Sequence, residues 1–306
     1  MKKLFFSVWQ FIKDVMHNWD EDNVPRLGAA LSFYTIFSIT PLLIILIALI
    51  GFFYNPNDAR SEIFLQIKEM VGREGAVLIQ NTLKNAANSK TGIIATAVSV
   101  ITLFVGATAL LNQLQNSLNT ICKVRRRKGR GIWGILKDRA IHLFVIITFG
   151  FFIVLFLVTG SVLSILDNYI DKNLAFILSL INFLFSLFII FLLFAILYKI
   201  LPDIKISWRD VWIGAFFTAL LFVIGKNFIT GYIGKTSYSS IYGAAGSLAV
   251  FLIWVYYSAQ ILFLGAEFTF VYASKYGKGI KPDSDSELIK IIRHDELVGL
   301  IENKVR

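Results

Sequence analysis

The stretch LGAALSFYTIFSITPLLIILIALIGFF (residues 27–53) decides the class of this protein, because it runs for 27 residues without a charged side chain. About 20 consecutive apolar residues are enough to carry a helix across the hydrocarbon core of a bilayer. Small and polar residues fill the first half, and Pro41 separates them from an apolar second half. Since proline removes a backbone hydrogen bond and kinks a helix, the stretch predicts a membrane-spanning helix with a hinge at Pro41.

The composition of the whole chain supports the same class. Of its 306 residues, 56% are hydrophobic and 16% are charged, and the mean hydropathy is +0.68. Soluble domains carry about 25% charged residues, and their surface helices keep a polar face that several of these runs lack. The single cysteine, Cys122, excludes an internal disulfide and suggests no cysteine-based metal site. We expect an integral membrane protein without a cofactor or a metal.

The apolar runs predict an all-α, polytopic membrane protein with six transmembrane helices. Together with their connections they form a transmembrane domain over residues 26–275. The expected spans cover residues 28–53, 92–117, 140–166, 174–200, 211–232 and 244–272.

Three segments lie outside these spans. Residues 1–25 carry apolar side chains at helical spacing, which predicts an amphipathic helix at the cytoplasmic membrane surface. Residues 54–91 show similar spacing and predict short amphipathic helices on the extracytoplasmic side, between the first two spans. Residues 276–306 form a charged cytoplasmic tail, in which we expect a short helix.

Lys and Arg are distributed unevenly between the two sides. With the N-terminus inside, 22 of the 30 lie on the inner side and 7 on the outer side. The positive-inside rule therefore predicts that both termini are cytoplasmic. The basic run KVRRRKGRGIWGILKDR (123–139) dominates this count, and we expect it to contact anionic lipid headgroups rather than nucleic acid. Its expected lipid contacts are Lys123, Arg125, Arg126, Arg127, Lys128 and Arg130.

Two ionisable residues lie inside apolar runs, where a charge is costly. At a rise of 1.5 Å per residue, Lys226 lies about 22 Å and Glu267 about 7 Å from the inner edge of the membrane. This difference in depth predicts that they do not form an ion pair. Lys226 either extends its ammonium to the outer headgroups or offers a contact to an anionic substrate. Glu267 either pairs with Arg26 or the headgroups, or faces a hydrated cavity.

Polar side chains at the depth of Glu267 favour a cavity that opens to the cytoplasm. They come from the inner half of the first span and from LLNQLQNSLN (110–119), whose amides recur at three and four residues on one helical face. The alternative is that these groups are hydrogen-bonding contacts between helices. The candidate cavity and substrate residues are Glu267, Asn112, Gln113, Asn116, Ser32, Tyr34, Thr35, Ser38, Lys226 and Gln260.

Two blocks of the sequence carry a family pattern. The first is DNVPRLGAALSFYTIFSITPLLIILIAL (22–49), with an alanine pair, an aromatic-Tyr step and Ser-x-x-Pro. The second is SSIYGAAGSLAVFLIWVYYSAQILFLGAEF (239–268), with Tyr-Gly-x-x-Gly, Trp-x-Tyr and Gly-Ala-Glu. Together they resemble the YihY/BrkB family of bacterial inner-membrane proteins, once labelled ribonuclease BN.

The resemblance covers about residues 20–275 and implies six spans in a bacterial plasma membrane. It implies no settled activity. Members are linked to serum resistance and to envelope or lipid traffic, and a transport role is often presumed. Because the second block includes Glu267, the resemblance favours a role for that residue.

The ribonuclease label conflicts with the residues present. Metal-dependent hydrolysis of a phosphodiester uses clustered carboxylates and histidines, whereas His17, His142 and His294 are scattered. The sequence has no phosphate-binding glycine loop, so an ATP-driven pump is not supported. We therefore expect no enzyme. The leading hypothesis is a transporter or translocator of lipid or solute, and the alternative is a non-transporting component that binds lipid or organises an envelope complex. A homo-oligomer is left open.

Overall fold

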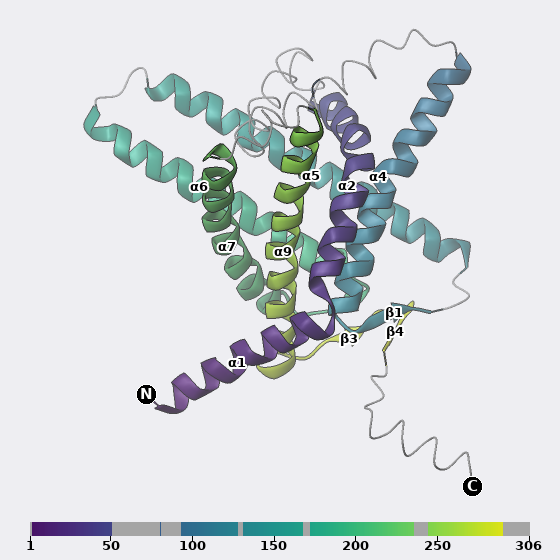
Figure 1. Cartoon of the computed structure of the whole chain (residues 1–306), viewed down its shortest axis with the longest axis vertical. Coiled ribbons are helices and arrows are strands. Elements are labelled where there is room, and N and C mark those ends of the chain that lie inside the picture. The colour runs from purple at the N-terminus through teal and green to yellow at the C-terminus, as the bar shows by residue number, and fades with distance from the viewer. Residues whose placement is uncertain are drawn as a thin grey trace.

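A computed structural model describes residues 2–50, 80, 93–127, 131–167, 172–235 and 244–289 (Figure 1). Long helices make up most of this part of the chain. They are α1 (Lys2–Glu21), α2 (Val24–Ile50), α4 (Ile93–Ile121), α5 (Ile132–Asp167), α6 (Lys172–Ile200), α7 (Trp208–Lys235) and α9 (Ala244–Lys275). The short strands are β1 (Val124–Arg126), β2 (Ile204–Lys205), β3 (Lys281–Pro282) and β4 (Ser286–Leu288).

Each of the six expected spans is helical wherever its residues are described. By length and composition, three helical stretches among those residues can cross a membrane: Leu180–Ile200, Trp208–Ile229 and Leu248–Lys275. The helix α2 begins four residues before the expected 28, because Pro25 lies in its first turn, where a missing N–H is tolerated. The helices expected within 54–91 and most of the tail lie outside the described residues.

The helix α9 is the centre of the bundle, in contact with α1, α2, α4 and α7 (Figure 1). Small residues let α7 approach it closely. A Cβ added at Gly265 would lie 2.5 Å from Tyr198 Oη and closer still to the Thr218 hydroxyl. The Tyr198 hydroxyl donates to the Leu262 carbonyl at 2.7 Å, which ties α6 to α9 at the same level.

The helix α1 lies across one end of the bundle, which we call the base (Figure 1). Phe11 packs edge-on against Phe268 of α9, with ring centroids 5.0 Å apart, and Val15 is buried. A second apolar face of α1 is exposed. It consists of Val8, Trp9, Ile12 and Met16.

The strands correct the expectation of an entirely helical chain. At the base, β1 pairs antiparallel with β4, and β2 pairs antiparallel with β3. Residues 286–288 belong to the tail in which a short helix was expected, and they are extended because they pair with β1. The Ile289 N–H continues this pairing by donating to the Lys123 carbonyl at 2.8 Å.

Candidate functional site

Glu267 is the most unusual side chain in the described part of the protein. It lies on α9 and is fully buried, at 0% exposure. Neither of its carboxylate oxygens has a hydrogen-bond partner there. A buried carboxylate normally has donors around it, because removing the charge from water costs several kcal/mol.

Lys226 does not supply the missing partner. The contacts between α7 and α9 show why: Gly214 faces Thr269 and Gly225 faces Tyr257. These antiparallel contacts place Lys226 level with residue 257 of α9, about 15 Å along the helix from Glu267. The predicted absence of an ion pair is confirmed. Arg26 is exposed and makes no bond to Glu267 either.

The groups that do surround Glu267 come from two chain junctions at the base. Asp22 lies between α1 and α2, and Lys123 follows α4. The Lys123 ammonium contacts Asp22 Oδ1 at 2.5 Å and Glu21 Oε2 at 3.5 Å. The side chains of Asp22 and Lys123 are 7% and 15% exposed. We call Asp22 and Glu267 the carboxyl pair.

The backbone at both junctions adopts a conformation that few residues favour. Asn23 has a φ of 50° and Lys123 a φ of 54°, in the left-handed region that glycine usually occupies after a helix. A lysine at such a position strains the backbone by about 1 kcal/mol. The strained residue Lys123 is the one whose ammonium contacts Asp22 of the carboxyl pair.

The carboxyl groups of Asp22 and Glu267 lie close enough to interact with each other, yet Asp22 Oδ2 and both Glu267 oxygens have no donor among the described residues. Two ionised carboxylates have no hydrogen to donate, so a hydrogen bond between them can form only when one of them is protonated. Burial raises the pKa of the Asp22 carboxyl, and the hydrogen bond and charge of Lys123 oppose that rise. The Cys122 thiol is close enough to both carboxyl groups to interact with them. Its pKa is raised by burial and then by the negative charges of Glu267 and Asp22.

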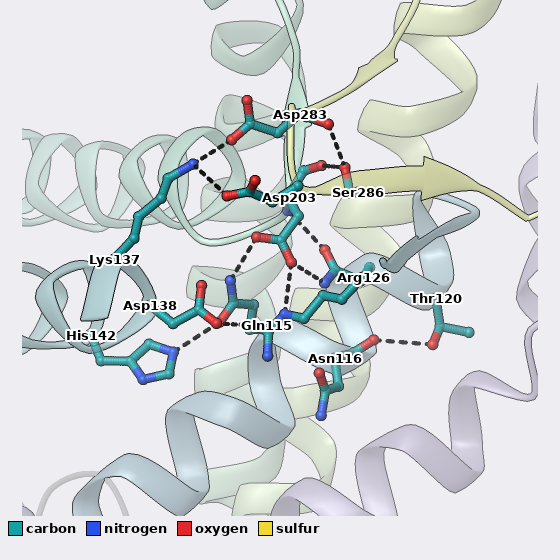
Figure 2. Close-up of polar contacts among 12 residues, drawn as sticks. Gln115, Asn116, Thr120, Arg126, Lys137, Asp138, His142, Asp203, Asp283 and Ser286 are labelled. Atoms are coloured by element: carbon teal, nitrogen blue, oxygen red, sulfur yellow. Dashed lines mark hydrogen bonds and ion pairs between the residues drawn. The ribbon is translucent and has the colours of Figure 1, made fainter. Parts of the chain in front are cut away.

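A second cluster, the Asp203 network, fastens the base of the bundle (Figure 2). Asp203 lies just after α6 and is 9% exposed. Gln115 Nε2 donates to Asp203 Oδ1 at 3.1 Å, and Asn119 Nδ2 donates to Oδ2 at 2.7 Å. Arg126 Nε donates to the same Oδ2 at 3.0 Å. One carboxylate thereby joins α4, β1 and the end of α6.

The network extends into α5 and the C-terminal strands. Gln115 Oε1 accepts from His142 Nε2 at 2.9 Å, so the proton of this imidazole is on Nε2. The Ser286 hydroxyl donates to the Asp203 carbonyl at 2.7 Å. Lys137 contacts Asp283 Oδ2 at 2.6 Å, and this hydrogen bond holds the pKa of Asp283 below its usual value (Figure 2).

The amide side chains of α4 do not all line one cavity face, as the sequence had suggested. Gln115 and Asn119 are buried and bonded to Asp203, whereas Asn116 is exposed. Asn112 is half-buried, and Gln113 donates to Ser117 at 3.3 Å. The buried amides Gln115 and Asn119 thus connect α4 to the segment that follows α6.

The expected cavity residues of α2 bond to the main chain. Ser32 and Thr35 donate to carbonyls one turn earlier in α2, at 2.9 and 2.7 Å, and Ser38 donates to Gly106 of α4 at 2.5 Å. Tyr34 is exposed. Gln260 lies against Gly28, and its amide nitrogen and oxygen have no partner among the described residues. No hydrogen bond joins any of these side chains to Glu267.

Part of the basic run pairs with acidic side chains of the protein. Lys123 pairs with Asp22, Arg125 with Glu287 at 2.8 Å, and Arg126 with Asp203. Arg127 is exposed. Lys128 and Arg130 lie outside the described residues.

Sequence reasoning missed the two acidic residues that organise the base. Asp203 is one carboxylate directly after a 29-residue helix, and Asp22 lies within the acidic run DED, which resembles an ordinary solvated helix end. The described residues contain no group of three side chains suited to a metal ion.

Comparison with known proteins places the chain among bacterial membrane proteins. It is 27% identical over 273 residues to a UPF0761 membrane protein of Mannheimia succiniciproducens, covering 88% of this chain and 89% of the relative. A UPF0761 membrane protein of Ralstonia nicotianae is 26% identical over 254 residues, which is 80% of this chain but 55% of that protein. The chain also spans 64% of a relative from Acinetobacter baylyi.

No solved structure matches the chain. The family model described as Virulence factor BrkB matches residues 15–289, from the buried face of α1 to the end of β4. This match takes in the carboxyl pair, the Asp203 network and all the helices between them, and the chain therefore belongs to the BrkB family of membrane proteins.

Proposed function

We propose that this protein crosses the bacterial inner membrane six times, with both termini in the cytoplasm, and translocates a lipid or a polar solute. The described helices support such a placement, because large apolar side chains are exposed along their outer faces. Examples are Phe183, Phe188, Phe216, Ile224, Phe228 and Ile253. The base, with its excess of Lys and Arg, would lie at the cytoplasmic surface.

The observation that carries the proposal is the unbonded, fully buried carboxylate of Glu267 on α9, the central helix of the bundle. Purely structural charges are usually satisfied, as Asp203 is by three donors. An ionisable group within a membrane bundle that lacks such partners is typical of ion and substrate pathways. Glu267 would change its contacts while the bundle alternates between conformations.

A second candidate is a non-transporting component that binds lipid or organises an envelope complex. The closed Asp203 network favours it, since the buried amides of Gln115 and Asn119 are bonded to Asp203 and do not line a cavity. The exposed face of α1, with Trp9 61% exposed, also suits a helix that rests on lipid. Arg127, Lys128 and Arg130 remain our expected contacts for anionic headgroups.

Glu267→Gln distinguishes the two candidates. It preserves the shape of the side chain and removes its charge. The matched control is Glu287→Gln, because that carboxylate is 42% exposed at the base. Each variant is expressed in a strain that lacks the gene, and growth under envelope stress is measured together with the amount of protein in the membrane.

If the proposal is right, Glu267→Gln reaches the membrane at the wild-type level and fails to restore growth, while Glu287→Gln restores it. Full restoration by Glu267→Gln contradicts the translocator and favours the non-transporting component. Proteoliposomes that contain a fluorescent phosphatidylethanolamine then test directly whether the cargo is a lipid. A lipid translocator would increase the fraction of the probe that an external quencher reaches.

A further inference from the structure

We propose that the carboxyl pair is a proton-binding site, in which one proton is held between Asp22 and Glu267 and is part of the folded base of the bundle. The inference goes beyond the proposed function, because it concerns what this site binds and not what the protein moves.

The first argument is the geometry of the oxygens. Asp22 Oδ1 accepts from the Lys123 ammonium at 2.5 Å. The other three oxygens of the pair, Asp22 Oδ2 and both oxygens of Glu267, have no donor in the described part of the chain. Glu267 is 0% exposed and interacts with the Asp22 carboxyl group, so two acceptors meet there without a donor between them. A hydrogen atom between the two carboxyl groups is the partner that this arrangement lacks.

The second argument is charge. Two ionised carboxylates beside one ammonium leave a net charge of −1 at a largely buried site. Carboxylates in contact cannot both ionise easily, and one of them takes up a proton. The other charged group at the site, Glu21, is 41% exposed and adds further negative charge. One added positive charge therefore balances Lys123, Asp22 and Glu267.

A metal cation fits this site poorly. Cations held by oxygen ligands take about six or more of them at close range. The pair offers three free oxygens, and among the described residues no group of three metal-ligating side chains occurs. A proton needs only two oxygens, one as donor and one as acceptor.

The strained junctions connect this proton to the conformation of the base. Asn23 and Lys123, both with positive φ, lie directly beside Asp22 and Cys122 in the chain. Loss of the proton places two like charges in contact, and movement of the α1–α2 junction away from α9 relieves both that repulsion and the backbone strain at Asn23. Deprotonation therefore loosens the attachment of the α1–α2 junction to α9.

Infrared spectroscopy of the full-length protein in lipid nanodiscs tests the inference, because the C=O stretching band of a protonated carboxyl group is absent from a carboxylate. The band is recorded while the pH is raised from 5 to 11, for the wild type, Glu267→Gln, Asp22→Asn and the control Glu287→Gln. We expect the wild type to keep the intensity of one protonated carboxyl at pH 7, both pair variants to lose it, and the control to retain it.

Two results would overturn the proposal. The first is a wild-type spectrum without this band at pH 7, which needs no variant and so does not depend on whether the variants fold. The second is a band that sodium chloride removes saturably at constant pH, which would make the site a sodium site. Because the measurement reports protonation alone, a protein that binds the proton yet translocates nothing would refute the proposed function and leave this inference intact.

Discussion

Substitution of Asp203 by alanine tests whether the Asp203 network holds the base together. Its carboxylate accepts from Gln115, Asn119 and Arg126 at 3.1, 2.7 and 3.0 Å. The substitution removes all three bonds at once. Gln115 is fully buried, at 0% exposure, so its amide finds no water in place of the lost acceptor.

The expected loss follows from these partners. A hydrogen bond to a charged group contributes about 1.5–3 kcal/mol, and a buried donor left unpaired costs about 1–3 kcal/mol. Arg126 keeps Asp138 at 3.5 Å and is 26% exposed, so its charge is not stranded. We therefore expect the free energy of unfolding to fall by about 3–5 kcal/mol, the range for removing one partner of a buried pair.

The matched control is Glu287→Ala, which removes the ion pair between Arg125 and Glu287 on the same face of the protein. The two side chains are 65% and 42% exposed, and water screens such a pair to about 0–1 kcal/mol. Unfolding is followed by titrating detergent-solubilised protein with SDS and recording circular dichroism. If Asp203→Ala unfolds within about 1 kcal/mol of Glu287→Ala, the network does not hold the base and the reasoning is wrong.

Three further predictions concern packing, reactivity and pH. Gly265→Ala places a Cβ against Tyr198, so it should destabilise the protein by about 1–3 kcal/mol. The control Gly131→Ala adds a Cβ that meets nothing within 4 Å and should leave the SDS midpoint of unfolding unchanged, so equal midpoints for the two variants would contradict the close packing. Cys122 should resist a maleimide at pH 7.5 until the protein is unfolded, because burial raises the pKa of its thiol, and mass spectrometry that finds rapid labelling of folded protein would refute this. Lys137 lowers the pKa of Asp283 in the folded protein, so the stability that this pair contributes is present above the unfolded-state pKa of about 3.9 and is lost as the pH falls below it. Hydrogen exchange of residues 281–288, corrected for the intrinsic rate, should therefore accelerate at low pH, and protection that stays constant from pH 6 to 3 would contradict a role for the pair.

The helices were predictable from the sequence because membrane helices have a local signal. The run after Lys172 is apolar from Leu174 to Leu197 apart from isolated polar residues, and the structure gives one helix from Lys172 to Ile200. The strands were not predictable. β2 has two residues, and its pairing with Lys281–Pro282 depends on contacts between segments far apart in the chain.

The candidate site was predictable only in part, for the same reason. Glu267 is conspicuous because a carboxylate interrupts an apolar run. Asp22 is not, because its sequence neighbours are charged and only the tertiary structure buries it. Gln115 and Asn119 were correctly placed on one face of a helix, but helical periodicity does not say which segment covers that face. Their partner Asp203 is 84 residues beyond Asn119.

The pairing of β1 with β4 has a consequence for the order in which the protein is made. Arg125 and its partner Glu287 are 162 residues apart, and a ribosome adds about 5–20 residues per second, so β1 waits roughly 8–30 s for its partner. All the described helices have been synthesised by then, because β4 is the last described element. The base is thus fastened only after all the described helices have been made, and a polypeptide released before residue 286 would carry β1 without its partner strand.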